Sequence, residues 1–327
     1  MGKFLVTGAA GFIGSHLAED LVKKGHSVKA FVHYNSSGFW GNLELLPPAI
    51  FKELEIHSGD IRDYDSVSKA MTGCDQVFHL AALIGIPYSY VSPLAYIQTN
   101  VVGTYNVLES ARLQNLENIL ITSTSETYGT AQYVPIDEDH PKVGQSPYSA
   151  TKIAADQLAA SYYYSFGLPV KIVRPFNTYG PRQSARAIIP TIISQLLDHG
   201  TKSVRLGNLY PTRDLTYVKD TVKGFLAIAV NEQCNGQAVN IGMSEEISMQ
   251  DLAGKIMKLS GIEKPVESEA IRERKDTSEV DRLCCNNKKL VKLTNWHPDY
   301  NLETGLTETI AFIRDRLNIY KSHLYNI

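Results

Sequence analysis

The chain has 327 residues, of which 43% are hydrophobic and 20% charged, and its 32 basic and 34 acidic side chains leave a net charge of −2. This composition is typical of a globular protein with a sizeable core, and the lack of a basic tail or stripe argues against nucleic acid as a partner. The sequence has no apolar stretch of about 20 residues that would span a membrane and no signal peptide, and none of its four cysteines has metal-ligand spacing, so we expect a cytoplasmic protein with reduced thiols and no metal site.

Apolar strands alternate with helical patterns through the first half of the chain. The strands are expected at residues 4–7, 27–32, 54–58, 76–80, 118–122 and 170–174. The helices between them are expected at residues 11–24, 65–71, 98–114 and 148–166. This alternation predicts an α/β fold with a doubly wound parallel sheet. The later segments are more polar and fit a smaller lobe, with helices at 187–199, 218–230, 249–259 and 302–317 and short strands at 203–206 and 237–241.

A glycine loop follows the first strand directly. Gly8, Gly11 and Gly14 have the spacing GxxGxxG, and the first helical pattern comes immediately after them. Glycine allows the backbone to turn sharply and to approach a pyrophosphate, and the N–H groups at the helix start, including those of Phe12 and Ile13, would face the anion. Because strand, loop and helix occur in the required order, the motif predicts a dinucleotide site rather than an ordinary glycine-rich turn.

A second motif combines a tyrosine with a lysine. Tyr148 and Lys152 are four residues apart in an expected helix and therefore share one face. A cation near a phenol lowers the tyrosine pKa toward the working pH. An exposed helical pair is the ordinary interpretation of this spacing. The glycine loop and the hydroxyl side chains after the strand at 118–122, where doubly wound sheets bind ligands, favour a catalytic pair instead.

These motifs together resemble the extended short-chain dehydrogenase/reductase family of nucleotide-sugar enzymes. The resemblance covers nearly the whole chain, including the segments at residues 59–63, 79–82, 99–104, 174–182 and 213–220. It implies a Rossmann sheet with a smaller, interleaved α/β lobe. The dinucleotide-binding domain would comprise residues 1–175 and about 208–241, and the sugar-nucleotide-binding lobe about 176–207 and 242–320. It also implies further cofactor contacts from Asp60, Ile61, Leu80, Ala81, Ala82 and Thr99, together with Tyr148 and Lys152.

The end of the second strand bears on the choice between NAD and NADP. Enzymes that use NAD usually carry an acid at this position, which bonds the ribose 2′-hydroxyl, but this chain has His33 there. A missing acid removes the repulsion of a 2′-phosphate, and His33, Asn35, Ser36 and Ser37 could donate hydrogen bonds to one. We therefore expect an NAD(P) cofactor with a preference for NADP, and NAD bound without the acid is the alternative.

The sequence Thr124-Ser125-Glu126 resembles that of GDP-mannose 4,6-dehydratases. The resemblance implies that Thr124, Tyr148 and Lys152 act with the cofactor to oxidise C4 of the sugar. Glu126 would remove the C5 proton before the C6 hydroxyl leaves and the hydride returns to C6, unless Glu126 only caps the next turn. The dTDP-glucose enzymes have Asp where this chain has Ser125, so the group that protonates the leaving hydroxyl stays open.

The segment at residues 174–197 resembles dehydratases of legionaminic-acid-type sugar synthesis, which act on UDP- or GDP-linked N-acetylglucosamine. By family position, Asn177 and Arg213 hold the substrate pyrophosphate, for which the planar guanidinium is suited. Arg182 and Arg186 either do the same or are solvated surface charges. We therefore expect a nucleotide-sugar 4,6-dehydratase whose substrate is UDP- or GDP-N-acetylglucosamine.

Other functions stay open. A 4-epimerase of the same family would not need Glu126, and UDP-glucuronate decarboxylases share Thr-Ser-Glu but differ at the start of the tyrosine helix. A non-catalytic, dinucleotide-sensing regulator is a different class of protein, and the intact set of Thr124, Tyr148 and Lys152 argues against it.

Two of the expected helices indicate a homodimer. The helices at 98–114 and 148–166 carry apolar and aromatic residues on more than one face, including Tyr162, Tyr163 and Tyr164. A helix that is apolar beyond one stripe needs a second partner. In the resembling family these two helices pair with their copies as a four-helix bundle, and we expect the same here.

Overall fold

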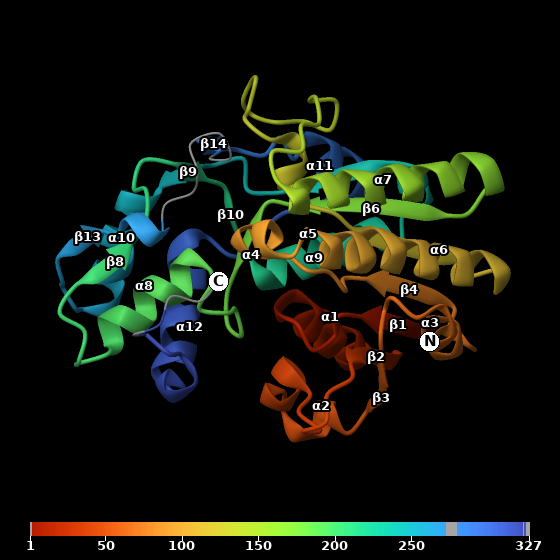
Figure 1. Ribbon diagram of the computed structural model, residues 1–327, viewed down its shortest axis with the longest axis horizontal. Helices are drawn as coiled ribbons and strands as arrows, with labels where there is room; N and C mark the ends of the chain where they lie inside the picture. Colours follow the sequence, from red (N-terminus) through yellow and green to blue (C-terminus); the bar gives the residue numbers. More distant parts are fainter. Residues whose placement is uncertain (1, 273–279, 323, 325–327) are drawn as a thin grey trace.

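Seven parallel strands form the central sheet of the computed structural model, which describes residues 2–272, 280–322 and 324 (Figure 1). The strands are β1 (Lys3–Thr7), β2 (Ser27–His33), β3 (Leu54–Gly59), β4 (Gln76–His79), β5 (Asn118–Thr122), β6 (Val170–Pro175) and β11 (Ala238–Ile241). They pair in the order β11-β6-β5-β4-β1-β2-β3, and every pairing is parallel. The predicted doubly wound, Rossmann-like α/β sheet is therefore confirmed. The strand order reverses between β1 and β4, which is where such sheets bind ligands at their carboxyl ends.

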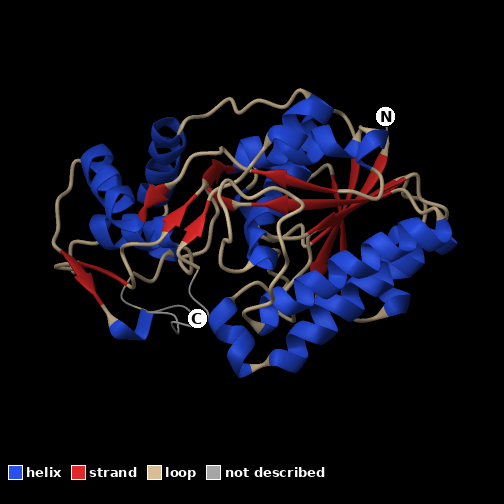
Figure 2. Cartoon of the chain, turned by 90° about the horizontal axis from the view of Figure 1, so that it is seen from above, coloured by secondary structure: helices blue, strands red, loops and turns tan. Residues whose placement is uncertain are grey.

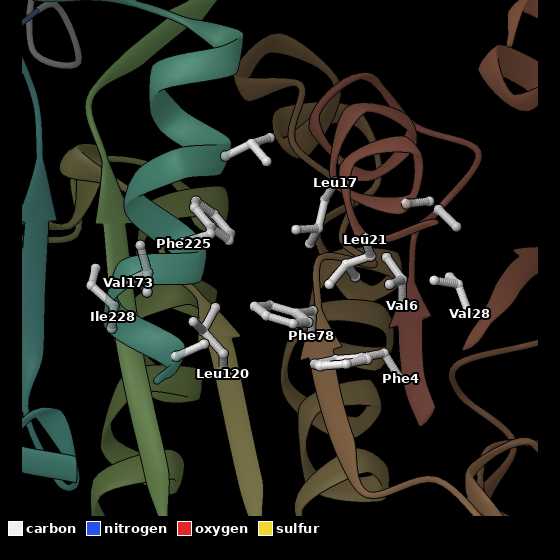
Figure 3. Packing of buried hydrophobic residues seen from close by; sticks show 14 of the residues in the cluster. Phe4, Val6, Leu17, Leu21, Val28, Phe78, Leu120, Val173, Phe225 and Ile228 are labelled. Atoms are coloured by element: carbon white, nitrogen blue, oxygen red, sulfur yellow. The ribbon is translucent and has the colours of Figure 1, made fainter. Parts of the chain in front are cut away.

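Helices cover both faces of this sheet (Figure 2), because successive side chains of a strand point to opposite faces. One face packs against α1 (Phe12–Lys23), α9 (Val218–Ala229) and α11 (Lys288–Thr294), and the other against α3 (Tyr64–Met71), α6 (Gly103–Leu113) and α7 (Pro147–Phe166). Val6 belongs to the first buried cluster, with Leu17 and Phe225 (Figure 3). Its neighbour Leu5 belongs to the second cluster. The sheet is thus held between two apolar layers, which fix the positions of its strand ends.

A smaller lobe lies at the end of the molecule away from the N-terminus (Figure 1). It contains α8 (Ile188–Leu197), α10 (Met249–Ser260), α12 (Leu302–Arg314), β8 (Val204–Leu206), β9 (Thr212–Arg213), β12 (Ile247–Ser248), β13 (Val266–Ser268) and β14 (Arg282–Leu283). Ile193, Leu252 and Leu306 are fully buried in its own hydrophobic cluster. The chain passes between the lobes more than once, because α9 and β11 pack in the larger one. Residues 273–279 of the range 242–320 lie outside the described residues.

The helix expected at 98–114 is divided. A π-helical turn, η2 (Ile97–Val102), precedes α6, and Asn100 is buried within it. Such turns are rare and occur frequently at functional sites. Several short elements were not expected, since three to six residues show little periodicity: α2 (Pro48–Phe51), α4 (Ile86–Val91), α5 (Pro93–Tyr96), β7 (Asn177–Tyr179), β10 (Leu215–Tyr217) and the 3₁₀ turns η1 (Gly41–Leu45), η3 (Ser125–Tyr128), η4 (Glu232–Cys234), η5 (Ala270–Arg272) and η7 (Leu317–Ile319).

Two kinds of feature are absent from the described part of the chain. None of its helices is both long enough and apolar enough to cross a membrane. None of its groups of three or more His, Cys, Asp or Glu side chains is placed to hold a metal ion. All four cysteines are buried free thiols.

Candidate active site

A cavity of about 1420 Å³ lies at the carboxyl ends of the central strands and extends to residues of the smaller lobe. Every candidate residue of the sequence analysis lines it except Asn35 and Ser36. The Asn35 side chain closes its own loop instead, because its Nδ2 donates to the Phe39 carbonyl at 2.8 Å and its Oδ1 accepts from the Ser37 hydroxyl at 2.6 Å. The structure therefore brings together residues that are as far apart in sequence as Gly8 and Arg213.

The glycine loop forms one wall of the cavity and has room for a pyrophosphate. At Gly8, where φ is +69°, a Cβ would lie 2.7 Å from the backbone nitrogen of Ala81, and at Gly14 a Cβ would lie 2.2 Å from the Gly8 carbonyl oxygen. At Gly11 a Cβ would meet only the Gly8 oxygen, at 3.1 Å, and would otherwise enter open space. No side chain caps α1, which begins at Phe12, so its first N–H groups are left to a ligand. These residues fit the pyrophosphate of a dinucleotide.

Arg62 and Asp60 form an ion pair at the cavity that was not predicted from the sequence. Arg62 Nε lies 2.9 and 3.1 Å from the two carboxylate oxygens of Asp60, and Nη2 lies 2.5 Å from one of them. The hydrogen bond from Arg62 is the main cause that lowers the pKa of Asp60. Both residues line the cavity with His33, which is exposed at the end of β2. The only sequence signal was a cation two residues after an acid in the segment at 59–63.

Tyr148 and Lys152 lie in the first turns of α7, whose start is fixed by a capping box between Ser146 and Ser149. Both side chains are buried. Lys152 Nζ donates to the Thr122 carbonyl at 2.6 Å. Burial lowers the pKa of Lys152 to about 8, against the attraction of the nearby Asp156 carboxylate.

The expectation that the Tyr148 pKa is lowered is wrong for the protein chain by itself. Burial raises this pKa far above its ordinary value, a hydrogen bond with Thr124 opposes the rise, and the Glu126 carboxylate adds to it. Desolvation of an enclosed phenol disfavours its charged form. The hydroxyl is therefore neutral in the protein chain by itself.

The turn after β5 carries the three other candidate catalytic residues. Thr124 is the cap of η3, because its Oγ1 accepts a hydrogen bond from the Glu126 N–H at 3.2 Å. Ser125 is buried, and Glu126 is half-buried and lines the cavity. The cap of this turn is thus Thr124, and the Glu126 side chain lies at the cavity wall.

The buried His79 joins three elements by hydrogen bonds. Thr104 Oγ1 donates to the Asn100 carbonyl at 2.6 Å, so at its 3.1 Å contact with His79 Nε2 the histidine must be the donor. Thr7 Oγ1 accepts from the N–H groups of Leu80 and Ala81, both at 3.2 Å, and gives its own proton to His79 Nδ1 at 2.8 Å. The bond that His79 Nδ1 accepts from Thr7 requires neutral imidazole, and burial lowers the pKa of His79 to about 3.

Asn100 extends this network to the catalytic helix. Its Oδ1 accepts from the Leu83 N–H at 2.8 Å, and its Nδ2 lies 3.0 Å from both the Leu83 carbonyl and Thr151 Oγ1. Thr151 Oγ1 in turn donates to the Tyr148 carbonyl at 2.7 Å. The π-helical turn thereby fixes the loop after β4 against the start of α7.

We expect acid to unfold the protein through its buried histidines. His16 is the second of these, with a pKa lowered to about 3 by burial and by Arg182. A histidine with a folded pKa below that of the unfolded chain contributes stability that is complete above pH 6.5 and is lost as the pH falls toward 3. For each one, the free energy of unfolding should fall by about 2 kcal/mol between pH 7.5 and 5. Urea titrations at the two pH values measure this fall in the free energy of unfolding. The fall should be smaller in His79→Gln, and in a variant of the exposed His199 it should match that of the unaltered protein. An equal fall in the unaltered protein and both variants would contradict the conclusion that buried histidines cause the loss of stability.

The four candidate substrate residues differ in their surroundings. Asn177 Nδ2 is buried with no hydrogen-bond partner among the described residues. Arg213 is buried, and its Nη1 donates to the Thr212 carbonyl at 2.8 Å. Arg186 is exposed at the cavity wall beside Gly85.

Arg182 is not a solvated surface charge. Its side chain is 9% exposed, and its Nη2 pairs with the Glu19 carboxylate and lies 3.0 Å from His16 Nδ1. Glu19 and His16 belong to α1, so the ion pair joins the cofactor helix to the segment that leads into the smaller lobe. Its Nη1 is buried with no hydrogen-bond partner in the described chain, which leaves one donor for a ligand of the cavity.

Comparison with known proteins identifies a family model, relatives and solved structures that are similar to this chain. The family model of GDP-mannose 4,6 dehydratase matches residues 5–309. The UDP-N-acetyl-α-D-glucosaminuronate decarboxylase of Bacillus cytotoxicus is 34% identical, over 95% of this chain and 97% of its own. The dTDP-glucose 4,6-dehydratase of Streptomyces griseus is 31% identical, over 94% of this chain and 93% of its own. The crystal structure of dTDP-glucose 4,6-dehydratase from Streptomyces venezuelae with NAD bound is 26% identical, with a TM-score of 0.88 over 98% of this chain and 99% of that chain.

Proposed function

This chain belongs to the GDP-mannose 4,6-dehydratase family of NAD-dependent sugar-nucleotide enzymes, and from that premise we propose that it is a 4,6-dehydratase acting on UDP- or GDP-N-acetylglucosamine. One observation carries the proposal. The Glu126 carboxylate lines the same cavity as the Tyr148 and Lys152 pair, close enough to raise the pKa of the phenol. An enzyme that only moved a hydride at C4 would not need this acid.

The proposed roles come from the family resemblance, and the position of these side chains around one cavity supports them. A bound nicotinamide would accept the hydride from C4 and later return it to C6. Tyr148 takes the proton of the C4 hydroxyl, which Thr124 helps to orient, and the Lys152 ammonium supplies positive charge on the same helix face. Glu126 takes the proton from C5 and gives a proton to the C6 hydroxyl, which leaves as water. When the hydride returns to C6, C5 takes a proton from solvent, and Tyr148 releases the C4 hydroxyl proton to solvent. Asn177, Arg182, Arg186 and Arg213 hold the pyrophosphate of the sugar nucleotide.

An assay with UDP-, GDP-, dTDP- and CDP-linked sugars tests this proposal. We expect a 4-keto-6-deoxy product from one N-acetylglucosamine nucleotide, with no net consumption of cofactor. A C4 epimer alone would contradict dehydration and indicate a 4-epimerase. Release of CO₂ from UDP-N-acetylglucosaminuronate would support the second candidate, a decarboxylase, which the 34% identical relative and the shared Thr124-Ser125-Glu126 favour.

For the cofactor we propose NAD(P), with a preference for NADP. The support is the missing acid at His33, to which the structure adds the Arg62 guanidinium at the same end of the cavity. Related structures contain NAD, so NAD is the alternative. Fluorescence titrations with NADH and NADPH decide between them, since tighter binding of NADPH supports the preference and tighter binding of NADH contradicts it.

We also propose a homodimer, because the packed elements α4, α5, η2, α6 and α7 carry exposed large apolar side chains, here called the apolar surface. Its exposed large side chains are Tyr88, Tyr90, Val91, Leu94, Ile97, Val102, Tyr105, Leu113, Tyr164 and Phe166. A patch of this kind on a helix pair marks an interface with a partner. We propose a cytoplasmic location as well, because its reducing conditions suit the four buried free thiols.

The dimer can be tested with two matched valines. Val102→Glu, within the apolar surface, should give a monomer in light scattering, because burying an unpaired carboxylate in an interface is costly. Val230→Glu, at the end of α9, should remain dimeric although Val230 is 84% exposed. A monomeric mass for the unaltered protein at micromolar concentration would refute the dimer.

A further inference from the structure

A buried arginine connects the two elements that carry the candidate catalytic residues. Arg174 lies near the end of β6, and its side chain is 1% exposed. Its Nε and Nη2 lie 3.0 and 2.9 Å from Asp156 Oδ2, and its Nη1 donates to the Tyr128 hydroxyl oxygen at 2.9 Å. The guanidinium carbon also lies 5.2 Å from the centre of the Tyr128 ring. All three side chains are buried, so these contacts are shielded from solvent.

The two partners of Arg174 belong to different catalytic elements. Tyr128 is the last residue of η3, two positions after Glu126, and its hydroxyl donates onward to Asn240 Oδ1 at 2.7 Å. Asp156 follows Lys152 by one turn of α7, so the two side chains share a helix face. A single planar group therefore spans the gap between the turn with Glu126 and the helix with Tyr148 and Lys152.

Stability alone gives little reason for this arrangement. A buried ion pair costs so much desolvation that apolar residues of similar volume are often as stable. The arrangement does fix geometry, because the planar guanidinium sets the angle and distance of Asp156 and Tyr128 at once. Asp156 also acts on the site, since its charge opposes the effect of burial on the pKa of Lys152.

We infer that Arg174 is a positioning residue, which holds η3 against α7 and thereby sets the place of Glu126 relative to Tyr148 and Lys152. The inference rests on the proposed function only for its effect on turnover. The mechanical part, that Arg174 restrains η3 through Tyr128, is independent of which sugar reaction the protein performs. Arg174 touches no reacting atom in this scheme and acts through its two partners.

Tyr128→Phe is the sharpest test, because it removes the bond to η3 and leaves the ring, the arginine and Asp156 in place. Tyr162→Phe is the matched control, since Tyr162 is also a buried tyrosine, on α7 itself, and its hydroxyl donates to Glu109 at 3.0 Å, which does not line the cavity. We expect Tyr128→Phe to lower kcat by roughly tenfold or more with KM for the sugar nucleotide within about twofold, because a misplacement of about 1 Å can cost 10²-fold in rate. Arg174→Lys should lose kcat similarly, since one ammonium cannot span both partners.

A second readout separates this inference from the proposed function. Hydrogen exchange, followed by mass spectrometry, should be faster in Tyr128→Phe than in the control for peptides covering residues 123–130. If the unaltered protein turns over no sugar nucleotide, the proposed function fails. The exchange experiment still tests whether Arg174 restrains η3 through Tyr128. Exchange at residues 123–130 that matches the control, or a kcat that matches the control in an active enzyme, would overturn the inference.

Discussion

Tyr148→Phe should reduce turnover by at least about 10²-fold and leave binding of the sugar nucleotide intact, because removal of a general base affects only the transition state. The ring of Tyr148 packs edge-on against that of Tyr96, with their centres 6.2 Å apart, and phenylalanine preserves this contact. The variant therefore tests the hydroxyl group alone. Steady-state rates of 4-keto sugar formation and calorimetric binding of the sugar nucleotide give the two quantities.

The control for this experiment is Tyr164→Phe. Tyr164 lies on the same helix but is 78% exposed, so the loss of its hydroxyl should not change the rate. A near-normal kcat in Tyr148→Phe would remove the tyrosine from the proposed mechanism. A loss of binding equal to the loss of rate would assign it to substrate binding instead.

Glu126→Gln should separate the two halves of the proposed reaction. The amide keeps the shape of the side chain but cannot accept the C5 proton. Oxidation at C4 depends on Thr124, Tyr148 and Lys152, and it should continue. The variant should therefore accumulate reduced nicotinamide, visible by its absorbance, yet release little 4-keto-6-deoxy product, with a loss of about 10²-fold or more.

Glu126→Asp provides the graded comparison, since it retains an acid with a shorter reach and should keep an intermediate rate. Solvent deuterium gives an independent check, because dehydration places deuterium at C5 and a simple 4-epimerase does not. If Glu126→Gln eliminated water at the normal rate, the dehydratase proposal would be wrong, whereas the roles of Tyr148 and Lys152 in C4 oxidation would stand.

The local features of this site were predictable from the sequence. The glycine loop was recognised because Gly8, Gly11 and Gly14 directly follow an apolar strand, and their tight backbone approaches agree with that interpretation. The helix that carries Tyr148 and Lys152 begins at Pro147, one residue before the predicted start. These features depend on residues that are neighbours in the chain, so spacing and periodicity are sufficient to find them.

Features that combine distant residues were missed or incorrectly predicted. The pKa of Tyr148 rises rather than falls, because burial disfavours the charged phenolate and the Glu126 carboxylate adds to the rise. Arg182 is a buried partner of Glu19, more than 160 positions earlier in the chain, and nothing near it in sequence indicates this. The π-helical turn around Asn100 interrupts a pattern that indicates one continuous helix.

The sequence by itself determined the glycine loop and most of the order of strands and helices, because these follow from local propensity and from the side-chain alternation of a strand. The residues expected at the cavity came from these motifs together with the family resemblance, and they included Asn35 and Ser36, which lie outside the cavity, but not Arg62, which lines it. Only the tertiary structure decided which charges are buried, which hydroxyls donate and how the turn with Glu126 is held against the helix with Lys152. The physical reason is that desolvation and hydrogen-bond direction depend on what surrounds a group in space. For Arg174 those surroundings come from α7 and η3, which the chain reaches 18 and 46 residues earlier.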